Sequence, residues 1–291
     1  MRKGLYKLIR WSGLPLILRN TIQRKKVTIL LFHDITIESA EKSFRYLKSH
    51  YNIISLDDLV KAIKKHEVHK LPSKSVVLTF DDGHKSNIDL LPLIKELQIP
   101  ITIFLCSSIV GTSRGFWFRS IESKEKITAL NAMRNRERLE ALEEEGFVQD
   151  SDRDDIQALQ DDDIMSMLPY VDFHSHSCFH PILPQCSDDE AWYEIQRSKQ
   201  ELESRYGQRV RYFSYPNGDY SQRDRDYVQE SGYECGVTVE PGYNDDNTDL
   251  FALKRFSVND TGDLSELIVK ASGCMAFLKK ILGKKTYGER Q

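Results

Sequence analysis

The sequence predicts an α/β protein built on a mainly parallel sheet, either open or closed into a barrel. Short runs rich in β-branched residues alternate along the chain with segments whose apolar residues recur at the helical period. This alternation is typical of strand–helix–strand units, in which successive strands run parallel. The chain has 291 residues, of which 40% are hydrophobic and 29% charged, so it can bury a core without disulfides.

The expected elements follow one another in a regular order. The strands are Val27–Phe32, Ser75–Phe80, Ile101–Leu105, Tyr170–Phe173, Val210–Tyr215, Gly236–Val239 and Phe256–Val258. The helices between them are Asp57–His66, Asn87–Leu97, Asp188–Tyr206 and Ser221–Ser231. Ser55 and Ser187 precede two of these helices and are suitable N-caps, because a serine oxygen can accept from a free N–H of the first turn.

One interval interrupts the alternation. Residues from about Ile121 to Leu168 contain helix formers and dense acidic charge but no convincing strand. We interpret this interval as a helical insertion on the rim of the domain and assign it no function, because a charge run is usually a solvated face. The expected organisation is a basic N-terminal arm over 1–26, one domain over 27–260, and a C-terminal helical tail over 261–291.

Charge and cysteine content exclude some classes of protein. A net charge of -3 argues against nucleic-acid binding, which usually requires a basic surplus. The five cysteines are scattered and form no C-x-x-C pair, so they are interpreted as reduced thiols. A cytoplasmic location is therefore expected.

The N-terminal arm is basic and partly apolar. Its apolar run Leu14–Leu18 is too short for a signal-peptide core or a membrane span. One interpretation is a basic helical arm on the domain surface. The other is an amphipathic segment that lies on the inner, anionic face of a membrane and makes peripheral contact with it. The candidate apolar contacts are Leu5, Tyr6, Leu8, Ile9 and Trp11.

Polar residues follow three of the expected strands. In α/β proteins, functional groups collect at the carboxyl ends of parallel strands. Here Ser75–Phe80 runs into a pair of carboxylates, Val27–Phe32 runs into a His-Asp pair, and Tyr170–Phe173 runs into a group of histidines. In chain order these residues are His33, Asp34, Asp81, Asp82, His174, His176 and His180.

The types and spacing of these residues suit a metal-dependent hydrolase. Adjacent carboxylates such as Asp81 and Asp82 point in different directions, so one can bind a cation while the other acts as a base. A hydrolytic zinc site needs three protein ligands and an open position, which Asp82 and two histidines would supply. His176 and His180 are four residues apart, a spacing that would place both rings on one side of a helical turn. Taken singly, an Asp-Asp-Gly is commonly a turn, and His33 could be a rim histidine.

Three motifs carry a resemblance to a known family. TFDDG at 79–83, HSCFHP at 176–181 and FSYPNG at 213–218 resemble successive motifs of the polysaccharide deacetylases. That family removes acetyl groups from N-acetylated or O-acetylated sugars. The resemblance spans roughly residues 27–258 and implies a distorted (β/α) barrel with the helical acidic segment inserted into it.

The resemblance implies a role for each matching residue. Asp81 would be the general base, and a divalent metal, with zinc as the first choice, would be held by Asp82, His176 and His180. A backbone N–H at Asn217 would hold the oxyanion. The third motif also assigns Tyr215 and Pro216 to substrate contact.

The sequence departs from the family pattern in the later motifs. The third motif usually carries an arginine, but this chain has Ser214-Tyr215 there, and the aspartate and tryptophan of the fourth motif are not visible. The fifth motif, a Leu-x-His that supplies the general acid, cannot lie near the C-terminus because no histidine follows His180.

An N-terminal segment can replace the missing histidine. Leu30-Leu31-Phe32-His33-Asp34 resembles the fifth motif displaced to the start of the domain, as in the poly-N-acetylglucosamine deacetylases. A closed barrel tolerates this permutation because its first and last strands are neighbours. His33 is therefore the expected acid that protonates the leaving amine, and Arg255 is the expected replacement for the missing arginine beside Asp81.

The predicted function is metal-dependent removal of an acetyl group, N-linked in the first instance, from a sugar or polysaccharide precursor. The substrate would be an oligosaccharide or a lipid-linked or nucleotide-linked sugar. One alternative is a degenerate deacetylase fold that binds sugar without catalysis. Another is a metallophosphoesterase of the polymerase-and-histidinol-phosphatase type, which Asp172-x-His174-x-His176 resembles. The lack of later histidines argues against that type and makes His174 a neighbour of the ligands.

Overall fold

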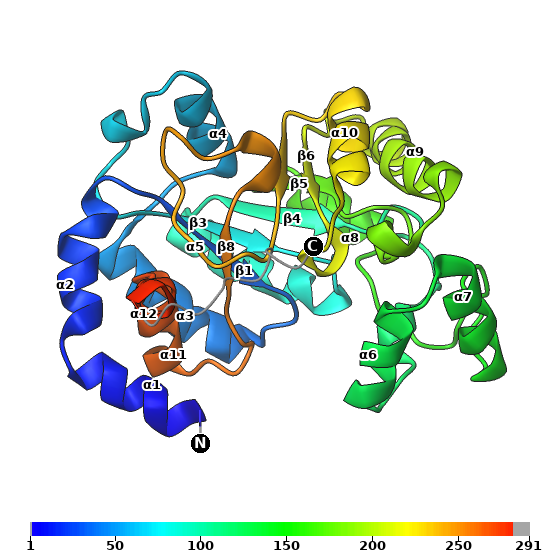
Figure 1. The fold of residues 1–291 in the computed structure, drawn as a ribbon, viewed down its shortest axis with the longest axis horizontal. Coiled ribbons are helices and arrows are strands. Elements are labelled where there is room, and N and C mark those ends of the chain that lie inside the picture. The colour runs from blue at the N-terminus through cyan, green and yellow to red at the C-terminus, as the bar shows by residue number, and fades with distance from the viewer. Residues whose placement is uncertain (1, 282–291) are drawn as a thin grey trace.

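A curved parallel sheet forms the centre of the protein, and the computed structural model describes residues 2–281 (Figure 1). The strands pair in the order β7-β6-β5-β4-β3-β1-β8, and short β2 pairs with β3 outside this path. Leu253, just before β8, forms a parallel bridge to Val237 at the end of β7, so the sheet nearly closes. The strands are β1 (Thr28–Phe32), β2 (Asn52–Ile53), β3 (Ser75–Phe80), β4 (Ile101–Leu105), β5 (Val171–Ser175), β6 (Tyr212–Ser214), β7 (Cys235–Val237) and β8 (Arg255–Ser257).

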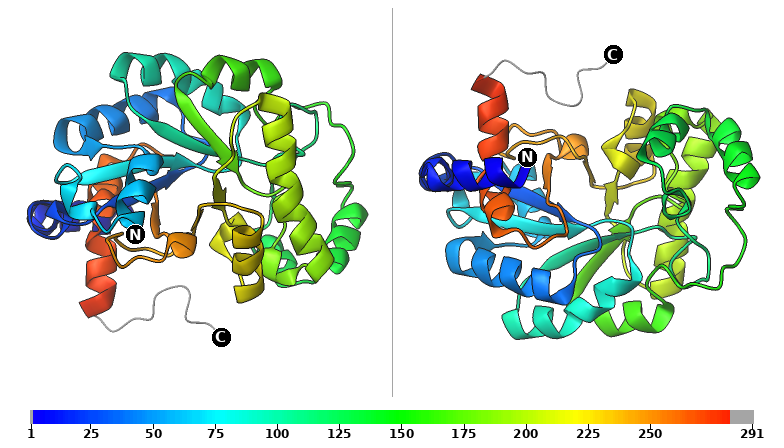
Figure 2. Two further views of the ribbon diagram at one scale, coloured as in Figure 1. Left: turned by 90° about the horizontal axis from the view of Figure 1, so that it is seen from above. Right: turned by 90° about the horizontal axis from the view of Figure 1, so that it is seen from below.

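Helices surround the sheet (Figure 2). They are α1 (Arg2–Trp11), α2 (Leu14–Asn20), α3 (Ile37–His50), α4 (Leu56–Lys64), α5 (Leu91–Leu97), α6 (Lys124–Asn131), α7 (Asn135–Glu144), α8 (Asp161–Met167), α9 (Asp188–Tyr206), α10 (Gln222–Glu230), α11 (Leu264–Ala271) and α12 (Cys274–Ile281). The prediction of an α/β barrel with parallel strands is therefore confirmed.

The local prediction of helices was mostly correct. Ser55 and Ser187 both cap their helices through a capping box, as their side chains accept from the N–H three residues on. The expected helix Asn87–Leu97 begins as a 3-10 turn, Lys85–Leu90, and becomes α-helical only at Leu91. Pro92 explains this, because proline lacks an N–H and clashes with the carbonyl four residues earlier. Helix α3 and the short strand β2 were not predicted.

The core has two parts because the sheet has two faces. On the outer face, Leu30, Leu78 and Ile103 pack with side chains from the surrounding helices, including Phe44 of α3. On the inner face, alternate residues such as Ile29 and Val77 pack with Phe104, Tyr212 and the apolar side of α4. Alternation along each strand therefore sends one set of side chains inward, where α4 packs with them, and the other set outward beneath helices such as α3.

The expected insertion is helical at both ends. It contains α6, α7 and α8, with irregular chain between α7 and α8, and α6 and α7 project from one side of the molecule (Figure 1). Among the described residues this interval contains no strand, and Ala158 makes only an isolated bridge to His84. A small core of Trp117, Leu130, Leu142 and neighbouring side chains holds α6 and α7 to the barrel.

The two N-terminal helices lie on the side of the molecule opposite α6 and α7 (Figures 1 and 2). They pack on α11 and α12 through a small cluster centred on Leu18, Val269 and Cys274. Of the expected C-terminal tail, residues 282–291 lie outside the described part of the chain. Nowhere in residues 2–281 does a helix combine the length and the apolar character that a bilayer crossing requires.

Two leucines that differ in burial test this packing. Leu30 is fully buried in β1, whereas Leu8 on α1 is 73% exposed. Leu30→Ala should lower the free energy of unfolding by about 2–5 kcal/mol, because it removes buried methyl groups and leaves a cavity. Leu8→Ala should change it by less than about 0.5 kcal/mol. Chemical denaturation of both variants measures the difference, and equal effects would contradict the assigned core.

Candidate active site

A sharp turn at the end of β3 separates two buried carboxylates. Asp82 (φ 72°) and Gly83 (φ 77°) both adopt left-handed backbone conformations. A Cβ at Gly83 would lie 2.6 Å from Leu105 Cδ2, so a side chain here would force Leu105 to move, and the left-handed backbone also favours glycine. The turn directs the side chain of Asp81 toward Arg255 and that of Asp82 toward the histidines after β5. The two adjacent carboxylates are thus directed toward different partners.

His176 and His180 converge, but not through a helical turn. Ser177 (φ 65°) and His180 (φ 57°) are left-handed, and the segment is an irregular loop after β5. The prediction that both rings lie on one side of a helical turn was therefore wrong. The rings still meet, with centroids 4.9 Å apart, because the two left-handed residues fold the loop back on itself.

Distant groups hold this loop in place. The carboxylate of Glu194, on α9, accepts the backbone N–H groups of Cys178 at 2.8 Å and Phe179 at 3.0 Å. From the other side, Trp117 Nε1–H donates to the carbonyl of His180 at 2.9 Å. Both ends of the short segment that carries His180 are therefore bonded to other elements.

Asp82, His176 and His180 form a buried three-residue cluster whose ligand atoms lie within 4.8 Å of one another. Asp82 Oδ1 is 3.4 Å from Nε2 of His176 and 3.5 Å from Nε2 of His180. Asp82 Oδ1 is buried and has no hydrogen-bond partner, which is costly unless a cation binds there. Two imidazole nitrogens and one carboxylate oxygen are a donor set that zinc accepts, so these residues fit a divalent metal.

The protonation states of the cluster suit a cation. Nδ1–H of His176 donates to the Ser214 carbonyl at 2.8 Å, which directs Nε2 toward Asp82. Burial lowers the pKa of His180 to about 4, so its ring is neutral near pH 7. Burial alone would raise the pKa of Asp82, but the bond from His84 and the nearby imidazoles outweigh it and lower that pKa well below its usual value.

His84 belongs to this site, although the sequence analysis did not single it out. Its Nε2 lies 3.0 Å from Asp82 Oδ2, and its ring packs edge-on against Phe116. The bond occupies Oδ2 and leaves Oδ1 facing His176 and His180. The position of His84 directly after Asp-Asp-Gly could have indicated that it belongs to the site. Its contact with Asp82 could not be predicted, because it depends on the left-handed turn.

Asp81 lies in a buried network of charged hydrogen bonds. Nη1 and Nη2 of Arg255 donate to Oδ1 and Oδ2 of Asp81 at 2.8 and 2.7 Å. Ser214 Oγ donates to the same Oδ2 at 3.0 Å and accepts from Arg255 at 2.9 Å. Burial alone would raise the pKa of Asp81, but the Arg255 charge, with His176, lowers it below the usual range. Asp81 is therefore an oriented carboxylate at neutral pH.

His33 follows β1, which lies between β3 and β8 in the sheet. Its N–H donates to Asp260 Oδ1 at 3.3 Å, and its carbonyl accepts from Asn87 Nδ2 at 2.9 Å. The partly exposed side chain is close enough to Asp81 that its charge helps to lower the pKa of that carboxyl. The neighbouring Asp34 pairs with Arg119 and accepts a hydrogen bond from Ser86. These two contacts fix the position of the chain next to His33.

The remaining predicted residues lie in different surroundings. Asn217 is exposed, with φ 56°, in the turn after β6. Tyr215 is fully buried and donates to the Phe251 carbonyl at 3.1 Å, and Pro216 is buried as well, so the Tyr215 ring does not face solvent. His174 packs against Tyr212 and accepts the Arg211 N–H, away from the cluster.

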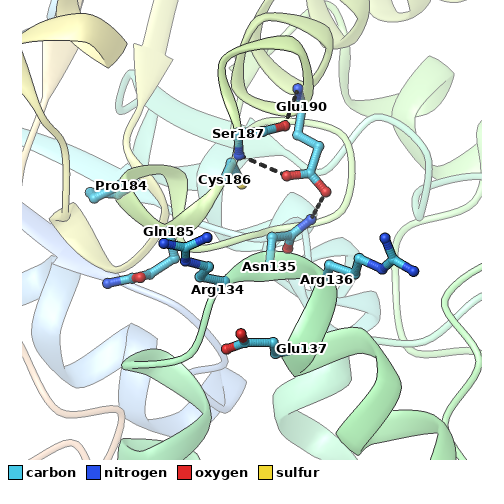
Figure 3. A pocket seen from close by; sticks show the side chains of 9 residues that line it. All are labelled: Arg134, Asn135, Arg136, Glu137, Pro184, Gln185, Cys186, Ser187 and Glu190. Carbon is cyan, nitrogen blue, oxygen red and sulfur yellow. Dashed lines mark hydrogen bonds between the residues drawn. The ribbon is translucent and has the colours of Figure 1, made fainter.

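A surface cavity lies elsewhere on the molecule (Figure 3). It is enclosed by the first turn of α7 and the chain leading into α9, and a hydrogen bond from Asn135 to Glu190 joins its two sides. Its lining contains neither carboxylate of the β3 turn and none of the site histidines. The cavity is therefore separate from the candidate active site.

Comparison with known proteins identifies the family. The model of the family described as polysaccharide deacetylase matches residues 68–236. The chain belongs to the polysaccharide deacetylase family. YxkH of Bacillus subtilis (strain 168), which is assigned to the polysaccharide deacetylases, is 25% identical over 192 residues, or 65% of this chain and 54% of that protein. The chain thus spans about half the length of this curated relative.

Solved deacetylase structures share the fold. IcaB from Ammonifex degensii superposes with a TM-score of 0.62 at 18% identity, covering 86% of this chain and 98% of that one. The Streptococcus pyogenes deacetylase PplD, in complex with acetate, superposes with a TM-score of 0.59 at 20% identity, covering 86% and 97%. At such low identity these matches establish the barrel. The family assignment replaces the metallophosphoesterase alternative.

Alanine substitutions at four histidines should differ in their effect on metal affinity. His176→Ala and His180→Ala should lose the metal, since each removes one of the three expected ligands. His84→Ala should weaken binding by about 10–100-fold, because it frees Asp82 to rotate. His174→Ala, the matched control, should bind as the parent does. Zinc titration against a competing chelator measures all four, and loss of binding in His174→Ala would contradict the ligand set.

Proposed function

We propose that this protein is a metal-dependent hydrolase that removes an acetyl group, N-linked in the first instance, from an acetylated sugar. The observation that carries the proposal is the buried Asp82, His176 and His180 cluster beside a second carboxylate, Asp81, that Arg255 orients. Membership of the polysaccharide deacetylase family supports the same reaction class.

The two carboxylates have separate proposed roles. When bound by Asp82, His176 and His180, a divalent metal would polarise the acetyl carbonyl and lower the pKa of water. Asp81 accepts the proton of the attacking water. Its bidentate contact with Arg255 holds it ionised and prevents it from rotating toward the metal ligands. The proposed base and the proposed ligands therefore stay distinct although they are adjacent in sequence.

The leaving group and the oxyanion require two further contacts. His33, at the end of the neighbouring strand β1, donates the proton that the departing amine needs. The backbone N–H of exposed Asn217 stabilises the oxyanion, since the turn after β6 adjoins Ser214, whose carbonyl orients His176. Position at the carboxyl ends of adjacent strands supports these assignments.

The proposed substrate is an N-acetylated oligosaccharide or a lipid-linked or nucleotide-linked sugar precursor. The proposed compartment is the cytoplasm. All five cysteines are free and buried, and burial raises the pKa of each thiol, so they are unreactive core residues and need no oxidising environment.

Acetate release tests the proposal and its main alternative. The zinc-loaded protein should release acetate from N-acetylglucosamine oligomers, and chelation should abolish this. Asp81→Asn should be less stable, because Arg255 keeps an unpaired buried charge, but it should still bind zinc, because all three proposed ligands remain. Its rate should fall at least about 100-fold, because it lacks the base. Asp89→Asn, an exposed carboxylate on the 3-10 turn after β3, is the matched control. Oligomer binding without acetate release would instead establish a non-catalytic sugar-binding protein.

His33 can be tested with two substrates of different leaving-group ability. An amine leaves only when protonated, whereas an activated ester has a leaving group that needs no proton. His33→Ala should therefore slow amide hydrolysis by about 10²–10⁴-fold and spare hydrolysis of an activated acetyl ester. Zinc titration of the same variant checks that metal binding is intact. Unchanged amide hydrolysis would overturn the role of the displaced motif.

A further inference from the structure

The N-terminal helices expose an unusual concentration of large apolar side chains. On α1, Leu5 is 51% exposed, Leu8 is 73% exposed and Trp11 is 80% exposed. On α2, Leu16 and Ile17 are 53% and 57% exposed. Leu5, Leu8 and Trp11 are spaced three residues apart and therefore lie along one side of α1. We refer to these five residues as the apolar face.

The apolar face is not the side by which these helices pack on the barrel. Tyr6, Ile9 and Leu14 point inward and pack on Leu18, Val269 and the first turn of α12. A helix needs one apolar stripe to dock on its own domain, and α1 has that stripe already. The second stripe is exposed to water in the described chain, an arrangement that usually marks an interaction surface.

The segment that carries the apolar face has charges of a single sign. Residues 1–26 contain eight basic side chains and no acidic one, although the chain as a whole has a net charge of -3. The basic residues are Arg2, Lys3, Lys7, Arg10, Arg19, Arg24, Lys25 and Lys26. Lys7 is exposed on α1, and among the described residues no carboxylate pairs with it, whereas Lys26 pairs with Asp245. Arg24 and Lys25 are exposed as well, so together with Lys7 they offer positive charge to an external partner.

We propose that α1 and α2 dock the protein on an anionic lipid surface, with the apolar face inserted into the headgroup region. Apolar burial and attraction of basic residues to anionic lipid together drive the binding of such helices. Trp11 suits the interface because tryptophan concentrates at the level of the headgroups. Contacts of α1 with α11 mean that insertion would hold the folded domain, not a loose tail, at the surface.

This docking is independent of the proposed acetyl hydrolysis, because none of the five residues contributes to the candidate active site. A lipid surface is favoured over a second copy of the chain by the charge. Two copies would bring two strongly positive segments together, and like charges at an interface oppose association. An anionic surface complements the same segment.

Co-sedimentation with vesicles tests the proposal on the full-length protein. It should bind vesicles that contain anionic phosphatidylglycerol and bind pure phosphatidylcholine vesicles at least about tenfold more weakly. The double variant Leu8→Ser with Trp11→Ser should lose about tenfold or more in affinity, because two apolar side chains no longer insert. Lys7→Glu should weaken binding to the anionic vesicles alone.

Matched variants elsewhere on the surface serve as controls. Val148→Ser with Met165→Ser removes two other exposed apolar residues, and Lys124→Glu reverses another exposed cation. These should bind vesicles as the parent does, and every variant should keep the parent's melting temperature and its acetate release from a soluble oligomer. Failure to bind anionic vesicles, or equal loss in the control variants, would overturn the proposal. The proposal would also be overturned if the protein bound no vesicles but formed a dimer that the Leu8 and Trp11 changes dissociated.

Discussion

The buried ion pair between Asp81 and Arg255 is the contact on which the rest of the site depends. Arg255 is fully buried, so its charge requires compensation at every donor. Asp81 satisfies two of them, the Thr238 carbonyl accepts from Nε at 2.7 Å, and Ser214 Oγ accepts from Nη2. The guanidinium therefore joins the ends of β3, β6, β7 and β8 at one point. Removing either partner would leave an uncompensated buried charge, which costs about 3–5 kcal/mol.

The ion pair also sets the direction of the neighbouring carboxylate. With Asp81 held by Arg255, the left-handed turn at Asp82 and Gly83 turns the second carboxylate toward the histidines. The β6 strand links both halves, because the side chain of Ser214 bonds Asp81 while its carbonyl orients His176. The serine that stands in place of the family's usual arginine is thus part of the same network as Arg255.

Elements outside the motifs support the loop that carries His176 and His180. Glu194 on α9 receives two backbone N–H groups of the loop, and burial still raises its pKa to about 7. Trp117, which packs into the small core of the insertion, holds the carbonyl of His180. Arg138 of α7 lies over the Trp117 ring at 4.9 Å. The insertion therefore contacts the candidate active site at two places. Arg138 packs on Trp117, and Ala158 and Leu159 bond the turn that carries Gly83 and His84.

Local sequence determined the strands, most helices, their caps and the motif residues at the strand ends, because hydrophobic period, capping and turn chemistry act within a few residues. It also indicated which carboxylates and histidines could form a metal site. Tertiary structure decided how they meet. His176 and His180 converge through two left-handed residues and not a helical turn, His84 bonds Asp82, and Tyr215 is buried in the core. These outcomes depend on contacts between residues far apart in the chain, such as Glu194 with the loop and Arg255 with Asp81, and no local pattern encodes their geometry.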